Sequence, residues 1–264
     1  MVEFAVNTGV VAPDAPVPEG IAKAADLGVG AVEFFDLAEA DPGAVREACT
    51  EHDVEIAAVL GSGDAANIDD RDAPAAVNPY DHDTVVAALE DALDEAAAVD
   101  AANLILTVGP DQGGFDRDTQ RRALERVLRV VAPVAEDAGV TVVVEPLNTL
   151  VDHPGYFLSS SREAFDIVRA VDSDHVTVLF DAYHQQITEG DVIRNLTENV
   201  DDVGHVHVAD NPGRYEPGSG EMAYGNILDA LDDAGYDGYV GMEFFETSEG
   251  TTIDEAIRGT LDLG

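Results

Sequence analysis

The sequence predicts a single α/β domain of the (β/α)₈ TIM-barrel class, covering residues 1–264. Short runs rich in Val, Ile and Leu alternate eight times with longer stretches of helical period. The 264 residues leave 33 for each strand-plus-helix unit, a length typical of such barrels. Neither a linker nor a change of composition marks a second domain.

The eight strand-like runs are nearly continuous in apolar residues, as expected for parallel strands that helices cover. In chain order they are Glu3–Thr8, Ala31–Asp36, Val54–Leu60, Asn103–Val108, Thr141–Leu147, Val176–Asp181, Val203–Ala209 and Gly238–Phe245. An open doubly wound sheet is the alternative. It usually carries a glycine-rich phosphate turn after its first strand, whereas this chain has Asn7-Thr8-Gly9-Val10-Val11 there.

Helical periods fill the segments between the runs. Two of them place apolar residues on one face: Val86, Leu89, Leu93, Ala96 and Ala97 in the first, and Leu124, Val127, Leu128 and Val131 in the second. Gly139 is the expected cap at the end of the second period, and Ser161 with Glu163–Ala164 is the expected start of the next helix.

The charge of the chain restricts its partners. It has 54 acidic and 13 basic residues, a formal net charge of −41, and the acids are spread along the whole sequence. Such a surface repels nucleic acids and anionic membranes. Self-repulsion of this size is screened at roughly 1 M salt, where the Debye length is about 3 Å. We therefore interpret the chain as halophilic.

Cysteine content and apolar runs point to a cytoplasmic protein. One cysteine, Cys49, excludes a disulfide framework and a cysteine-based zinc cluster. The apolar runs are far shorter than a membrane span, and no charged-then-apolar leader precedes the first strand-like run.

Ionisable residues stand at the ends of the last four strand-like runs. They are Glu145, Asp181, His207 and Glu243. The chemistry of a barrel lies at the carboxyl ends of its strands, so these four side chains are expected to meet. Alternation directs Glu145 to the same face as Val143.

Any one of these residues alone is equally well explained as an ordinary polar residue at a strand end. Three carboxylates in one buried mouth, however, repel one another and shift their pKa values. A divalent cation removes this conflict, and three oxygen donors with one imidazole suit Mn²⁺, Mg²⁺ or Co²⁺.

Four further residues are candidates near the same mouth. His184 and Arg214 follow the sixth and seventh strand-like runs. Arg214 could hold a substrate carboxylate or hydroxyl; a salt bridge to Glu216 or Glu221 is the alternative. His184 by itself is better explained as a surface-loop histidine. His205 is expected to be a buried, hydrogen-bonded core residue and Glu33 a partner behind the cluster, with both roles left open.

Some chemistries are excluded by the residues themselves. Lys23 lies in the first helical segment, so a Schiff-base aldolase lacks its lysine. The chain has neither a Gly-x-Ser-x-Gly elbow nor a Walker-type phosphate loop.

Several motifs in the second half resemble the hydroxypyruvate isomerase family of xylose-isomerase-like barrels. They are Glu145–Asn148, Pro154–Leu158, Phe180–Ile187, Gly204–Asp210, Pro212–Glu221 and Gly235–Gly241. The resemblance implies that Glu145, Asp181, His207 and Glu243 bind one divalent metal ion (Mg, Mn or Co). It also implies that Glu145 and Glu243 transfer protons, that His184 and Arg214 bind substrate, and that the protein is a dimer or tetramer.

The activity implied is interconversion of hydroxypyruvate and tartronate semialdehyde, an aldose–ketose type isomerisation through an enediolate. Typical members carry glutamine where this chain has His207, while the related tagatose 3-epimerases carry histidine. A ketose 3-epimerase is therefore the alternative. An endonuclease IV-like nuclease and a non-catalytic barrel are more remote, because of the net charge and the complete set of four candidate ligands.

Overall fold

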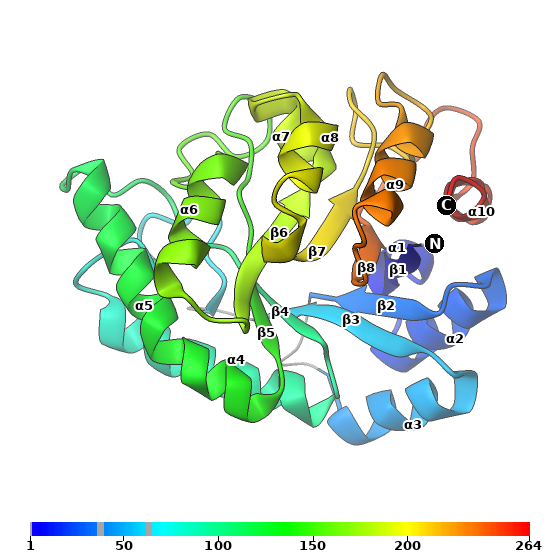
Figure 1. Cartoon of the computed structure of the whole chain (residues 1–264). Coiled ribbons are helices and arrows are strands. Elements are labelled where there is room, and N and C mark those ends of the chain that lie inside the picture. The colour runs from blue at the N-terminus through cyan, green and yellow to red at the C-terminus, as the bar shows by residue number, and fades with distance from the viewer. Residues whose placement is uncertain (1, 36–39, 62–64) are drawn as a thin grey trace.

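The computed structural model describes residues 2–35, 40–61 and 65–264. Eight parallel strands close into one barrel in chain order, with β8 returning to pair with β1, and helices surround it (Figure 1). The strands are β1 (Glu3–Asn7), β2 (Ala31–Phe34), β3 (Glu55–Leu60), β4 (Asn103–Leu106), β5 (Thr141–Val144), β6 (Val176–Asp181), β7 (Val203–Val208) and β8 (Tyr239–Met242). The predicted (β/α)₈ class is confirmed.

Each predicted strand contains the observed one, and most predicted ends run one to three residues too far. The predicted end of the second run, Asp36, lies outside the described residues. The overrun occurs mainly at the carboxyl ends, because the chain there stays buried and apolar after strand pairing has stopped, as at Leu147 and Phe244.

The helices are α1 (Thr8–Val11), α2 (Val17–Leu27), α3 (Pro42–His52), α4 (His82–Ala98), α5 (Arg117–Ala138), α6 (Ser161–Val171), α7 (Ala182–Thr188), α8 (Val192–Thr197), α9 (Tyr224–Asp233) and α10 (Ile253–Leu261), with the 3₁₀ turn η3 (Val200–Asp202). α5 shows why they form. Asp116 caps its first turn, its predicted apolar face is buried, and Gly139 ends it at a positive φ of 70° that suits glycine.

Two details of the predicted helices differ. In α4 the buried face uses Val85 and Ala92 with Leu89, Leu93 and Ala96, and Val86 and Ala97 lie at its margin. The cap of α6 is Ser160, whose hydroxyl accepts the backbone N–H of Glu163, so Ser161 is the first helical residue. The first difference turns the buried face of α4 toward Val85 and Ala92, and the second moves the start of α6 by one residue.

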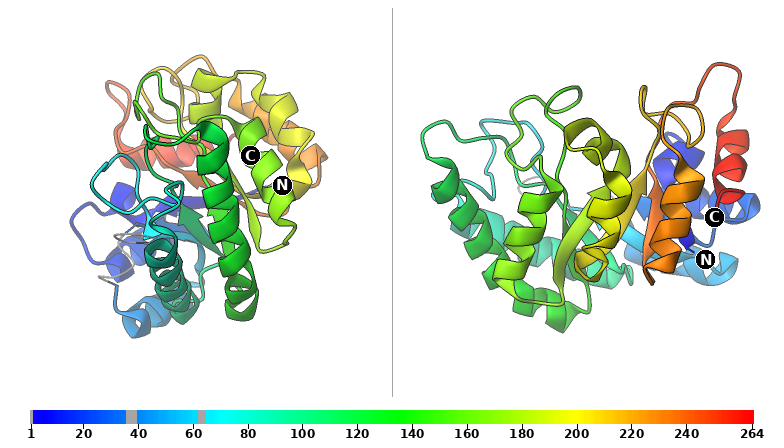
Figure 2. Two further views of the ribbon diagram at one scale, coloured as in Figure 1. Left: turned by 90° about the vertical axis from the view of Figure 1, so that its left-hand side faces the viewer. Right: turned by 45° about the horizontal axis from the view of Figure 1, so that its top comes forward.

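The core has two parts. The larger one packs the outer faces of the strands against the helices. Inside the barrel, Ala58, Ile105, Val143 and Leu179 form one apolar layer, and Ala5, Ala31 and Ala57 form a layer of small residues. The long loops after β5, β7 and β8 rise from the same end of the barrel (Figure 2, right).

The two ends of the chain lie close together, beside α10 (Figures 1 and 2). Across the described part of the chain, none of the helices is long and apolar enough to cross a bilayer.

Candidate active site

The four predicted ligand residues converge at the carboxyl ends of β5 to β8. Glu145, Asp181, His207 and Glu243 are all buried, and one donor atom from each lies within 4.8 Å of the others. Asp181 and His207 are register partners on β6 and β7, which sets them side by side. Glu145 and Glu243 directly follow β5 and β8, which are three strands apart around the closed barrel.

His207 lies between the carboxylates. Its Nδ1 is 3.3 Å from Oε2 of Glu243 and 3.6 Å from Oε1 of Glu145, while its Nε2 is 3.2 Å from Oε2 of Glu33. Within the described residues neither ring nitrogen makes a hydrogen bond of normal geometry. Burial opposes charging of the imidazole, but the charges of Glu33 and Glu243 outweigh it and raise its pKa well above the usual value.

The three carboxylates have different environments. Burial, with the charge of Glu243 beside it, raises the pKa of Asp181 to about 6, and burial raises the pKa of Glu145 as well. Burial acts on Glu243 in the same way, but Arg214 and His207 outweigh it and lower its pKa. The surroundings of the two glutamates thus shift their pKa values in opposite directions, upward for Glu145 and downward for Glu243.

Arg214 reaches this cluster from the loop after β7. Its Nη2 donates to Oε2 of Glu243 at 2.7 Å, and its guanidinium lies over the ring of Tyr183, 5.4 Å from the centroid. Glu243 is thus the partner of Arg214. Glu216, one of the two alternative partners expected from the sequence, instead accepts a hydrogen bond from the backbone N–H of Ser248. The Nε of Arg214 is buried with no partner in the described part of the molecule, and the residue lines the cavity over the cluster.

His184 is fully buried on α7, which begins where β6 ends, so it is not a surface-loop histidine. The backbone N–H of Asn148 donates to Nδ1 of His184 at 3.3 Å, and the side-chain Nδ2 of Asn148 lies 2.6 Å from the same ring nitrogen. A backbone N–H can only donate, so Nδ1 accepts and the ring proton is on Nε2. Burial and the nearby charge of Arg214 lower the pKa of His184 to about 4, which keeps the ring neutral.

A cavity of about 220 Å³ opens over the cluster. Glu145, Arg214 and Glu243 line it together with Thr107 and His153, and its other walls are apolar: Phe35, Leu60, Ile68, Ile105, Leu147 and Phe245. Sequence reasoning missed Thr107, His153 and Asn148. Asn148 stands in a motif that carries the family resemblance, and Thr107 stands just past β4. Their positions at the carboxyl ends of strands could have identified both as residues of the barrel mouth.

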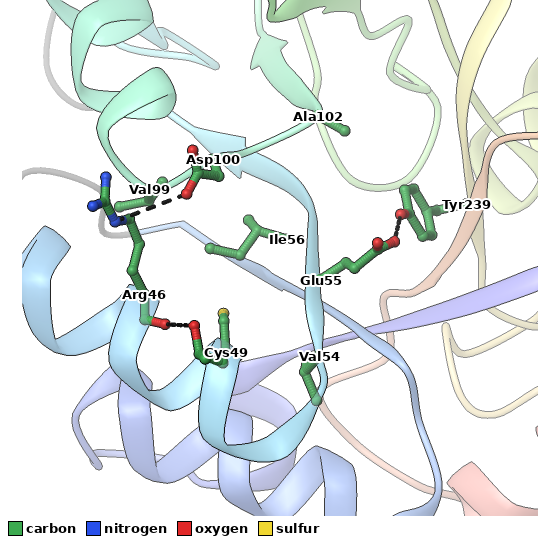
Figure 3. Close-up of a pocket in the computed structure, with 10 residues that line it drawn as sticks. Arg46, Cys49, Val54, Glu55, Ile56, Val99, Asp100, Ala102 and Tyr239 are labelled. Atoms are coloured by element: carbon green, nitrogen blue, oxygen red, sulfur yellow. Dashed lines mark hydrogen bonds and ion pairs between the residues drawn. The ribbon is translucent and has the colours of Figure 1, made fainter.

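A larger cavity, about 700 Å³, lies at the other end of the barrel (Figure 3). Arg46 and Asp100 form an ion pair across it, and the Tyr239 hydroxyl donates to Glu55. Within the described residues its lining contains no convergent group of acids, bases and metal ligands. Residues at this end of a barrel contribute to stability, and the carboxyl ends of the strands carry the chemistry.

The donor set at the mouth fits a divalent metal ion. Oxygen and nitrogen ligands at roughly 2.0–2.6 Å from an ion lie up to about 4–5 Å from one another, which agrees with the spacing of the four donor atoms. His207 also presents Nδ1 to Glu145 and Glu243 without a hydrogen bond. Three buried carboxylates and one imidazole match Mg²⁺, Mn²⁺ or Co²⁺ better than a softer metal.

Comparison with known families identifies the family of the chain. The family model described as "Xylose isomerase-like TIM barrel" matches residues 21–262. The chain belongs to this family. The resemblance drawn from the motifs of the second half is thereby confirmed at the level of the family.

Two curated relatives have closely related names. A 2-oxo-tetronate isomerase from Cupriavidus necator is 36% identical over 153 residues, and a hydroxypyruvate isomerase from Escherichia coli is 31% identical over 151 residues. The matched region spans 58% of this chain and of the first relative, and 57% of this chain and of the second. A solved structure described as AP endonuclease, family 2, from Brucella melitensis has a TM-score of 0.86, with 29% identity, over 97% of this chain and 96% of its own.

Proposed function

We propose that the protein is a metal-dependent isomerase of short hydroxy-keto acids that interconverts hydroxypyruvate and tartronate semialdehyde or acts on the closely related 2-oxo-tetronate. The observation that carries this proposal is the placement of Glu145 and Glu243. Both carboxylates reach the same edge of His207, from strands three apart in the barrel, and both line the cavity. The names of the relatives from Cupriavidus necator and Escherichia coli support the same reaction class.

The reaction needs two positioned proton carriers. One glutamate removes a proton from the hydroxyl-bearing carbon next to the carbonyl, and the electrons move into a C=C bond to give an enediolate. The other returns a proton to the former carbonyl carbon. The proton of the neighbouring hydroxyl passes to the former carbonyl oxygen, so that the first oxygen becomes the aldehyde and the second the new hydroxyl. A bound divalent ion would polarise the two adjacent substrate oxygens and stabilise their negative charge.

The remaining side chains bind and orient the substrate. The neutral His184 presents its Nε2–H near Asp181, 3.7 Å from Oδ2, and makes no hydrogen bond there to any described residue. We expect this N–H to donate to a substrate oxygen bound beside Asp181. Arg214 lines the cavity, and its guanidinium is the group we expect to bind a substrate carboxylate. A neutral ketose gains little from this cation, and for this reason we favour a keto acid over a sugar.

A ketose 3-epimerase is the second candidate, because His207 is the residue that epimerase relatives carry at this position. The two candidate functions are separated by measuring kcat/KM side by side, with Mn²⁺ or Mg²⁺ at high salt. The substrates are hydroxypyruvate, 2-oxo-tetronate, fructose and tagatose. We expect the two acids to be preferred, and Arg214→Gln to raise KM for the acids most. Preference for the neutral ketoses, with acids unaffected by Arg214→Gln, would establish the epimerase instead.

A nuclease is the third candidate, since the solved structure from Brucella melitensis is described as an endonuclease. The net charge of −41 opposes DNA binding. Incision of a duplex that contains an abasic site, at a rate above a metal-free control, would overturn the isomerase proposal if the keto acids were not turned over.

A further inference from the structure

Glu33 is a buried acid inside the barrel that the proposed reaction does not use. It lies on β2, is 0% exposed, and contacts two histidines of β7. Its Oε1 is 2.5 Å from Nε2 of His205, a hydrogen bond. Its Oε2 is 3.2 Å from Nε2 of His207, an ion-pair contact without the angle of a normal hydrogen bond. The carboxylate of Glu33 therefore faces the Nε2 atoms of both imidazoles. The Nδ1 atom of His207 faces Glu145 and Glu243.

The barrel is built to make room for this carboxylate. Gly241 on β8 is the register partner of His207. A Cβ at Gly241 would lie 2.0 Å from Oε1 of Glu33 and 2.9 Å from Cδ2 of His207. Ala31, two residues before Glu33, packs with Ala5 and Ala57 in the layer of small residues below. A larger side chain at 241 would displace either the acid or the histidine.

The cluster of Glu33, His205 and His207 could in principle hold a cation of its own, since its donor atoms also lie within 4.8 Å of one another. Three points oppose that reading. The Glu33–His205 contact of 2.5 Å is a hydrogen-bond length and leaves no gap for an ion, and the acid faces nitrogens on both sides. His207 would also have to serve two ions at once.

We propose that Glu33 is a positioning residue that acts through His207, holding the proton of that ring on Nε2 so that the Nδ1 lone pair is directed at the cluster of Glu145, Asp181 and Glu243. Histidines that bind metals usually donate their second N–H to such an outer carboxylate or carbonyl. His205 has the supporting role of donating to the other oxygen of Glu33. This inference rests on the metal site of the proposed function.

The test is metal binding by the full chain, with activity left aside. Removal of such an outer carboxylate typically weakens metal binding about 10–100-fold. Glu33→Gln keeps the size of the side chain but removes its charge. The new amide can also direct its NH₂ group, a donor, toward Nε2 of His207. We expect it to raise the Mn²⁺ dissociation constant of the metal-stripped protein, measured by electron paramagnetic resonance, by that factor. The matched control is Glu216→Gln, a buried acid that holds Ser248 in a loop; it should change the constant less than about two-fold.

The outcomes separate the two proposals. Wild-type protein that binds no divalent ion would overturn the metal site and this inference together. One ion bound equally well by wild type and Glu33→Gln would overturn the role of Glu33 alone. Two ions in the wild type and one in the variant would make Glu33 a ligand of a second site, which also overturns it.

A measurement on the wild type covers the case in which Glu33→Gln does not fold. In protein loaded with diamagnetic Zn²⁺, long-range ¹H–¹⁵N correlation identifies the protonated nitrogen of each imidazole. We expect His207 to carry its proton on Nε2, next to Glu33, and a proton on Nδ1 would overturn the inference.

Discussion

Asp181 and His207 are register partners because the pairing of β6 with β7 slips by one residue. Val178 pairs with Val203, but Leu179 pairs with His205, so Gly204 is the extra residue. Without this slip Asp181 would face Val206, and its carboxylate and the His207 ring would point to opposite sides of the sheet. The site therefore depends on a bulge at a glycine.

Gly204→Val should damage both the fold and the site. A Cβ there would lie 2.2 Å from Oγ1 of Thr177 and 3.0 Å from Cγ1 of Val143. We expect a loss of about 1–3 kcal/mol of unfolding free energy, the usual cost of overpacking, with weaker Mn²⁺ binding. Thermal unfolding and Mn²⁺ titration check this. The control is Gly113→Val, at a glycine with open space around it; equal effects at both positions would contradict a special role for Gly204.

Metal removal should abolish activity. The three carboxylates beside His207 fit one divalent ion per chain. Elemental analysis of the active protein should find about one equivalent, and dialysis against a chelator should remove the activity, with Mn²⁺, Mg²⁺ or Co²⁺ restoring it. Full activity in protein shown to be free of metal would refute the metal site.

Each of Glu145→Gln and Glu243→Gln should reduce kcat by a factor of about 10² or more, since each removes one proton carrier. Because both residues are also candidate ligands, turnover is measured at saturating Mn²⁺, with bound metal determined in parallel. Glu216→Gln is the matched control and should retain its turnover. Near-full turnover in either site variant, with metal bound, would remove that glutamate from the mechanism.

Asn148→Asp should impair substrate handling through His184. The amide N–H of Asn148 lies 2.6 Å from Nδ1 of His184. An aspartate there accepts instead of donating, so it opposes the backbone N–H of residue 148 and shifts the ring toward the tautomer protonated on Nδ1. We expect kcat/KM to fall about 10-fold or more, the value of one hydrogen bond to a polar substrate group, with Mn²⁺ affinity unchanged. Asn148→Asp with wild-type kcat/KM would show that the tautomer does not matter.

The melting temperature should rise steeply between about 0.1 and 2 M KCl, since screening weakens the repulsion within a chain of net charge −41. At about pH 4, where many exposed carboxyl groups are protonated, the rise should be shallower. A flat salt profile at neutral pH would refute the interpretation of the acidic surface as halophilic.

The barrel was predictable from sequence because its signals are local. A strand buried on both faces needs a short apolar run, and a helix that covers it needs apolar residues at helical spacing, as in α5. Eight repeats of both patterns are compatible with few architectures. The four residues that converge at the mouth were predictable for the same reason. An ionisable residue that closes an apolar strand, such as Asp181 after Phe180, is visible without any knowledge of its neighbours.

Relations between distant segments were decided only by the tertiary structure. The pairing of Arg214 with Glu243, and not with the nearer Glu216, depends on how the loop after β7 folds over β8. The burial of His184 and the proton on its Nε2 depend on a backbone N–H from the loop after β5. Glu33 stands 172 positions before His205 and contacts it only because the barrel closes. Register, loop path and ring tautomer are set by partners far away in the chain, so no local pattern records them.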